Sequence, residues 1–163
     1  MFIPTDTTFT LAFAQFPEGV EAPNRRDGEN VTAPPEGHPI PLRPPSVNEP
    51  QMWKLVAGPD PEQESYAIVH VPSSPNPGTE ELGFCSISAE SGAPIILSSP
   101  TYYVLKPTKF TTPGGPLLVT IHPKGFSSDN DYVIPSDEGT LQVQTIQATT
   151  GTWPGWVITP VMI

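Results

Sequence analysis

The sequence predicts a folded all-β domain, since one count excludes long helices and a second indicates that the chain folds. The chain has 24 prolines in 163 residues, and because a proline inside a helix costs about 3 kcal/mol, long helices are excluded. Leu, Ile, Val and Phe account for 39 of the 163 residues, a share above the level of roughly 20% below which chains stay disordered. We therefore expect one folded domain over residues 1–163, with its prolines in loops and at strand ends.

The first unit of the chain, about residues 8–58, contains four short runs in which apolar residues alternate with others. The runs lie at 9–11, 31–33, 40–42 and 53–55. Period-2 alternation of this kind is typical of strands with one buried face. Glu36 and Gly37 form a turn signal between the second and third runs, and the fourth run opens with the aromatic Trp53.

Two further units, about residues 65–108 and 117–161, repeat this order. The second has runs at 66–68, 84–87, 95–97 and 103–105, and the third has runs at 119–121, 132–134, 141–143 and 156–158. Gly92 and Gly139 stand in the turn before the third run of each unit, and Tyr103 and Trp156 open the closing runs. Self-similarity at a fixed period indicates a repeat architecture.

Twelve short strands in three similar units predict a β-trefoil, in which three pseudo-repeats of four strands form a capped six-stranded barrel. A closed barrel removes the exposed edges that an open sheet would leave. The alternative is a β-sandwich without symmetry, whose strand spacing looks periodic by accident. The units differ most in their loops, and departures from a shared scaffold are where function is expected.

Composition narrows the class of partner. The chain has 7 basic and 17 acidic residues, for a net charge of −10, so it offers little surface for phosphate neutralisation and we expect no nucleic-acid partner. The apolar runs are too short to span a bilayer, and anionic lipid should not attract the chain, so we expect no membrane association. The first ten residues lack the features of a signal peptide, which predicts a cytoplasmic protein, or one released by a non-classical route.

No catalytic or metal-binding motif is present, and we expect neither an enzyme nor a cofactor. The three histidines, His38, His70 and His122, lack metal-ligand spacing. His70 and His122 both follow the first run of their units, where surface or barrel-rim positions explain them better than ligation. Cys85 lies in an apolar run and is interpreted as a small buried hydrophobe rather than a nucleophile.

The segment Gln51-Met52-Trp53 carries a Gln-x-Trp pattern that recurs in sugar-binding trefoils. In those proteins the pattern is expected in several units, whereas here it occurs once. The tryptophans are therefore better explained as core residues that close the barrel. A carbohydrate-binding lectin remains an alternative.

The sequence resembles the fungal β-trefoil protease inhibitors, in particular the mycocypins (clitocypin and macrocypin). The segments that carry the resemblance are 50–55, 66–68, 81–86, 93–96 and 153–158. The chain is also similar, in the same scaffold positions, to the mushroom β-trefoil inhibitors of serine proteases. The resemblance implies a monomeric inhibitor of papain-like cysteine proteases, with a target protease as its partner.

In mycocypin-like proteins two loops of the first unit enter the protease cleft. Transferred to this chain, the resemblance implies two sets of protease-binding residues. These are Asn24, Arg25, Arg26, Asp27, Gly28 and Glu29 in the first loop, and Pro45, Ser46, Val47, Asn48 and Glu49 in the second. Prolines flank both loops and should limit the entropy lost on docking.

Two further interpretations stay open. Family members present an asparagine of the second unit to legumain-type asparaginyl proteases, and Asn76 stands in the matching loop, although Asn76-Pro77 also fits a simple turn. Alternatively, Arg25 or Arg26 enters the acidic specificity pocket of a trypsin-like serine protease. The plain reading of this pair is two solvated arginines.

Overall fold

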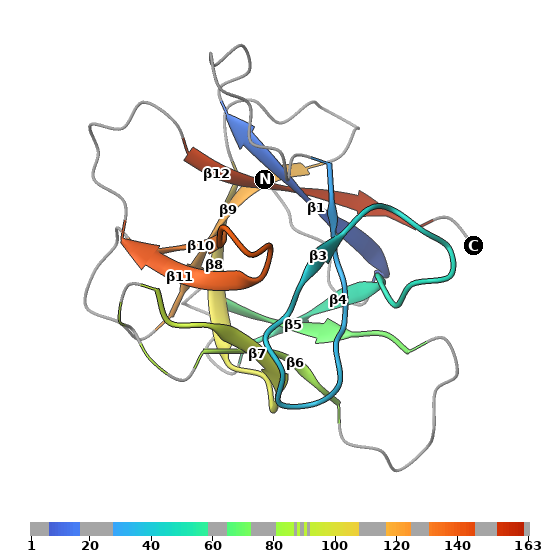
Figure 1. Ribbon diagram of the computed structural model, residues 1–163, viewed down its shortest axis with the longest axis horizontal. Coiled ribbons are helices and arrows are strands. Elements are labelled where there is room, and N and C mark those ends of the chain that lie inside the picture. Colours follow the sequence, from blue (N-terminus) through green and yellow to red (C-terminus); the bar gives the residue numbers. More distant parts are fainter. Residues whose placement is uncertain are drawn as a thin grey trace.

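The computed structural model describes residues 7–16, 28–58, 65–72, 81–86, 88, 90, 92–107, 117–124, 131–145 and 153–161. The regular secondary structure of these residues consists of β-strands, with no helix among them, which confirms the all-β prediction (Figure 1). No helix long and apolar enough to cross a membrane occurs in this part of the chain. The strands are β1 (Phe9–Phe16), β2 (Asn30–Val31), β3 (Leu42–Arg43), β4 (Trp53–Ala57), β5 (Ser65–His70), β6 (Gly83–Ser86), β7 (Ile95–Ser98), β8 (Tyr102–Pro107), β9 (Leu117–Pro123), β10 (Asp131–Pro135), β11 (Leu141–Thr145) and β12 (Trp153–Pro160).

Six of these strands close into an antiparallel barrel. β1 pairs with β12 along its whole length and also with β4. The ring continues from β12 to β9, β8 and β5, and β5 returns to β4. Closure leaves no edge of this ring unpaired, which argues against an open two-sheet sandwich.

The other six strands form three hairpins, β2–β3, β6–β7 and β10–β11. Single bridges link each hairpin to the other two, through Pro39 with Ile96, Pro94 with Gln142, and Pro41 with Thr140. The hairpins thus form a ring of their own, arranged around the centre of the view in Figure 1. Since each bridge includes a proline, which lacks an N–H, these ladders cannot extend far.

Three aromatic residues at the start of β4, at β8 and in β12 are completely buried: Trp53, Tyr103 and Trp156. The indole N–H of Trp53 donates to the carbonyl oxygen of Val31 at 3.0 Å, and that of Trp156 donates to the carbonyl oxygen of Val133 at 2.9 Å. Each ring therefore fastens a hairpin to the barrel, and the expectation that the two tryptophans are core residues is confirmed.

Tyr103 makes the corresponding connection in a different way. Its hydroxyl hydrogen-bonds to the hydroxyl of Ser86 on β6. Burial of the ring raises the pKa of Tyr103 to about 12, because the charged phenolate would lose its hydration there. Burial, and not the contact with Ser86, therefore keeps the hydroxyl of Tyr103 neutral.

Candidate functional site

Part of each predicted protease-binding set lies in the described residues. Gly28 and Glu29 are described at the end of the β1–β2 loop, and residues 45–49 are described in the β3–β4 loop. Asn24, Arg25, Arg26, Asp27 and Asn76 lie outside the described residues. The site is therefore built from the β3–β4 loop, residues 44–50, and from the end of the β1–β2 loop.

The register of β2 and β3 brings these two loops together. Asn30 is paired with Arg43, so the residue that precedes β2 and the residue that follows β3 leave the hairpin at the same end. Gly28 donates its N–H to the carbonyl of Phe13 at 2.8 Å, and Phe13 donates to the carbonyl of Glu29 at 3.1 Å. These two bonds fix the end of the β1–β2 loop to β1.

Gly28 has a φ of 87°, in the left-handed region that glycine adopts without a steric penalty. A side chain at this position would meet no atom within 4 Å. The glycine is therefore required by the backbone conformation rather than by crowding.

The β3–β4 loop presents Val47 to solvent, with an exposed fraction of 101%. Next to it, the backbone N–H of Asn48 donates to the hydroxyl of Ser46 at 3.2 Å, and the N–H of Glu49 donates to the carbonyl of Ser46 at 3.4 Å. These bonds form a compact turn around the valine. A single exposed aliphatic side chain is ordinary on a protein surface, so what singles out Val47 is that a hydrogen-bonded turn presents it within the predicted protease-binding loop.

Gln51 holds the base of this loop. Its side-chain carbonyl accepts from the amide of Asn30 at 3.2 Å and from the backbone N–H of Ser46 at 3.0 Å. Its NH2 group donates to the hydroxyl of Thr32 at 3.2 Å and to the carbonyl of Pro44 at 3.0 Å. The side chain is buried, so both donors and both acceptor sites are used inside the protein.

The sequence placed Gln51 in a sugar-binding pattern, and the structure shows that its amide is engaged by the protein itself. Sequence reasoning missed that Gln51 joins the loop to the first hairpin, because its partners in that hairpin, Thr32 and Asn30, stand 19 and 21 residues away along the chain. The signal in the sequence that could have indicated this role was the position of Gln51, directly after Pro50 and two residues before the core residue Trp53.

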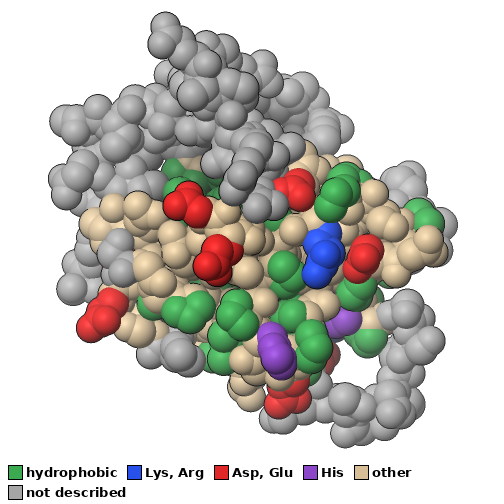
Figure 2. All heavy atoms as spheres, in the orientation of Figure 1, with side chains coloured by type: hydrophobic (Ala, Val, Ile, Leu, Met, Phe, Trp, Pro, Cys, Tyr) green, Lys and Arg blue, Asp and Glu red, His purple; other side chains and the backbone are tan. Residues whose placement is uncertain are grey.

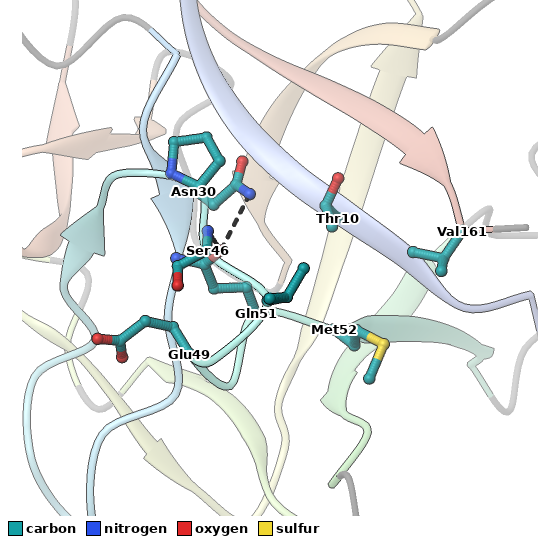
Figure 3. A pocket seen from close by; sticks show the side chains of 9 residues that line it. Thr10, Asn30, Ser46, Glu49, Gln51, Met52 and Val161 are labelled. Atoms are coloured by element: carbon teal, nitrogen blue, oxygen red, sulfur yellow. Dashed lines mark hydrogen bonds between the residues drawn. The ribbon is translucent and has the colours of Figure 1, made fainter.

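A hollow of about 560 Å³ opens beside the β3–β4 loop. Figure 3 shows its lining side chains, which come from the loop, from β1 and β2, and from the residue after β12. Most of the lining is apolar. The lining residues are Thr10, Asn30, Pro45, Ser46, Val47, Glu49, Gln51, Met52 and Val161.

The flanks of the β5–β6 loop lie next to the same region. The N–H of Val71, just after β5, donates to the carbonyl of Met52 at 2.9 Å. Near the other end of that loop, Glu81 forms an ion pair with Lys54 of β4 at 3.3 Å. The described residues on either side of the β5–β6 loop, Val71 and Glu81, therefore lie beside Met52 and Lys54.

The face seen in Figure 2 carries more acidic than basic side chains, in keeping with the net charge of −10. Within the described residues, no three His, Cys, Asp or Glu side chains are grouped so that they could hold a metal ion. Cys85 is half-buried rather than buried, and burial raises the pKa of its thiol.

The two histidines predicted to be equivalent are not. His70 is opposite Trp53, whereas the residue opposite Tyr103 is Pro123, one position beyond His122. His122 is buried rather than at the surface. Its ring contacts the hydroxyl of Thr120 at 2.7 Å and the carbonyl of Asp131 at 3.0 Å, so its polar atoms have partners in the interior.

Comparison of the sequence with models of protein families and with curated proteins found no match.

Proposed function

We propose that this protein is a β-trefoil protease inhibitor that blocks the active-site cleft of a papain-like cysteine protease with its β3–β4 loop. The observation that carries the proposal is Val47, fully exposed on a turn whose base is held by the buried amide of Gln51. Inhibition would be reversible occlusion, without covalent chemistry.

The β-trefoil assignment is supported by the way the strands are grouped. Six strands form the barrel, and three hairpins form a ring joined by single bridges. Trp53 and Trp156 each fasten a hairpin to the barrel by the same kind of bond, an indole N–H to a hairpin carbonyl. This recurrence is what three similar units of four strands would produce.

A held loop suits an inhibitor because binding must overcome the entropy of ordering the contact residues. Each rotamer-rich side chain that becomes fixed on docking costs roughly 0.5–1.5 kcal/mol, and ordering a flexible loop adds to this cost. The bonds around Ser46 and Gln51, together with Pro44, Pro45 and Pro50, order the loop before a protease is met. Less of the binding free energy is then lost on association.

The chemistry of the exposed side chain favours one class of target pocket. Val47 is aliphatic, so the protease subsite that receives it should be apolar rather than the acidic pocket of a trypsin-like enzyme. The lectin alternative rests on the Gln-x-Trp pattern of residues 51–53. Gln51 and Trp53 are both buried and hydrogen-bonded within the protein, so this pattern does not favour sugar binding.

The proposal is tested by titrating the protein against papain, legumain and trypsin. We expect inhibition of papain, and we expect Val47→Asp to weaken it at least tenfold without lowering stability, because this side chain has no folded-state contacts to lose. Tyr102→Ser is the matched control, since Tyr102 is the other exposed large apolar residue of the described chain. Absence of inhibition of all three proteases at micromolar concentration, with binding to a glycan array, would overturn the proposal in favour of the lectin.

Two variants separate the other protease classes. Asn76→Ala should affect inhibition of an asparaginyl protease alone. The double variant Arg25→Ala, Arg26→Ala should abolish inhibition of trypsin, if trypsin is inhibited, and leave papain unaffected. A loss of papain inhibition in the double variant would place the contact in the β1–β2 loop instead of the β3–β4 loop.

A further inference from the structure

His70, the last residue of β5, has a buried polar atom without a partner. Its Nε2 atom forms no hydrogen bond with any described residue. Buried polar groups are ordinarily hydrogen-bonded, so an exception calls for a physical explanation. A neutral imidazole tolerates such a place better than a charged one, because burying a charge without a partner costs far more than burying an unpaired neutral group.

This histidine lies against the residues that anchor the β3–β4 loop. His70 is paired with Trp53 across the β4–β5 ladder, and the centroids of the two rings are 5.4 Å apart. The N–H of Val71 donates to the carbonyl of Met52 at 2.9 Å. Met52 and Trp53 directly follow Gln51, whose amide holds the base of the loop. A displacement of the histidine ring would therefore act on the anchor of the loop through directly contacting residues.

The charged and titratable side chains around this end of β5 do not face the ring. β4 and β6 are the strands that pair with β5 here. Lys54 of β4 follows Trp53, so it points to the opposite face of that strand, where it forms an ion pair with Glu81 at 3.3 Å. On β6, Phe84 packs on Trp53, so its neighbour Cys85 points the other way. Among the described residues of these strands, no carboxylate is placed to stabilise a proton on the ring.

Proton uptake would make the packed position of His70 unfavourable. The charged ring would lose its hydration, and a protonated Nε2 would carry an N–H with no acceptor among the described residues. Burial accordingly lowers the pKa of His70 below its ordinary value of 6.5. The packed arrangement is thus fully favoured above pH 6.5, and it loses ground to an arrangement with a hydrated ring as the pH falls towards the lowered pKa.

We infer that His70 is a pH-sensitive switch for the β3–β4 loop. The neutral ring packs on Trp53 and supports the anchor of the loop, whereas the protonated ring leaves Trp53 and loosens the anchor. Inhibition of a protease then weakens as the medium becomes acidic. This inference rests on the proposed function for its effect on a protease, but the switch itself is observable without any protease.

The first test follows two NMR signals of the free protein, the ring of His70 and the ¹³C-labelled methyl group of Met52, which lines the hollow beside the loop (Figure 3). Met52→Leu assigns the methyl signal. We expect both signals to titrate with one midpoint below pH 6.5, while circular dichroism shows that the protein stays folded. His70→Phe should abolish the titration of Met52, and the control His38→Gln, which removes an exposed histidine, should leave it in place. Different midpoints in the parent protein, or an unchanged Met52 titration in His70→Phe, would overturn the switch.

The second test measures inhibition constants for papain at pH 7.5 and pH 5. Because papain itself depends on pH, the parent protein is compared with each variant at the same pH. We expect the ratio of the parent's inhibition constant to that of His70→Phe to rise about threefold on acidification, and the ratio to that of His38→Gln to stay constant. A constant ratio for His70→Phe would overturn the switch and leave the proposed function standing. Joint titration of His70 and Met52 in a protein that inhibits no protease would overturn the proposed function alone.

Discussion

The side-chain carbonyl of Gln51 accepts the backbone N–H of Ser46 at 3.0 Å. Gln51 precedes β4, whereas Ser46 begins the turn that presents Val47. Because the amide of Gln51 also bonds to Asn30 and Thr32, a single buried side chain joins the β3–β4 loop to the first hairpin. The shape of the loop therefore depends on a residue that lies outside it.

We predict that Gln51→Ala destabilises the protein by about 2 kcal/mol, because several partners would be left without a hydrogen bond in a buried place. Inhibition should weaken by at least tenfold, since the loop would have to be ordered on binding. Urea unfolding and inhibition assays under conditions where the variant is folded measure the two effects separately. Gln144→Ala is the control, because its half-buried side chain accepts one hydrogen bond on β11.

Gln51→Glu tests the same clamp more finely. The variant keeps an oxygen that can accept from Ser46 and Asn30, but it faces the carbonyl of Pro44 with an oxygen instead of an NH2 group. We expect it to impair inhibition as Gln51→Ala does. Full activity in Gln51→Glu would show that the bond to Pro44 does not hold the loop.

Gly83 of β6 is predicted to tolerate no side chain. A Cβ atom at this position would stand 2.2 Å from the carbonyl oxygen of Ile68, which is backbone and cannot rotate away. We expect Gly83→Ala to cost about 3 kcal/mol of unfolding free energy, at the upper end for overpacking. Gly92→Ala, where only the φ of 94° opposes a side chain, should cost about 1 kcal/mol. Chemical denaturation followed by circular dichroism would decide, and equal costs would contradict the difference.

His70 should make stability depend on pH. Its Nε2 atom is buried with no hydrogen-bond partner among the described residues, and burial lowers the pKa of the ring below its ordinary value of 6.5. The unfolded chain then binds a proton at this ring more readily than the folded protein does. The contribution of His70 to the unfolding free energy is therefore fully present above pH 6.5 and is lost as the pH falls towards the lowered pKa. Unfolding free energies measured at pH 7.5 and pH 5 should show this loss.

His70→Phe should reduce the same loss. The ring centroids of His70 and Trp53 are 5.4 Å apart, with an angle of 62° between the ring planes. Phe13 packs on Trp156 in nearly the same way, with a centroid distance of 5.2 Å and the same angle. A phenylalanine at position 70 should therefore fit against Trp53. We expect the variant to be less sensitive to pH between 7.5 and 5 than the parent protein. An unchanged pH dependence would assign the effect to other groups.

Much of the fold could be predicted because its signals are local. Alternating apolar residues indicated the strands. A closed barrel was predicted because closure pairs the N–H and C=O groups that the edge strands of an open sheet would leave exposed. The third run of the first unit was expected over 40–42, yet β3 comprises Leu42–Arg43 alone. Pro39 and Pro41 lack the N–H that a longer ladder needs, and Pro44 ends the strand on its other side.

The candidate site was less accessible to sequence reasoning. That the two loops leave the first hairpin together follows from antiparallel pairing alone, but the clamp at Gln51 depends on contacts between residues far apart in the chain. His122 illustrates the same limit. Its burial depends on Thr120 and on the carbonyl of Asp131, and the periodicity of apolar residues carries no information about such partners.

The two tryptophan closures provide a test of the repeated architecture. Trp53→Phe and Trp156→Phe each remove an indole N–H that donates to a hairpin carbonyl, of Val31 and of Val133 respectively, and each leaves unfilled volume in a fully buried site. Lost hydrogen bonding and the cavity together should cost about 2–4 kcal/mol.

Tyr103→Phe removes a hydroxyl whose partner Ser86 is only half-buried, and should cost about 1 kcal/mol. Guanidinium unfolding followed by far-ultraviolet circular dichroism measures all three. Similar losses in the two tryptophan variants would support equivalent roles in the first and third units, whereas a cost under about 0.5 kcal/mol in either variant would show that its indole does not hold the hairpin to the barrel.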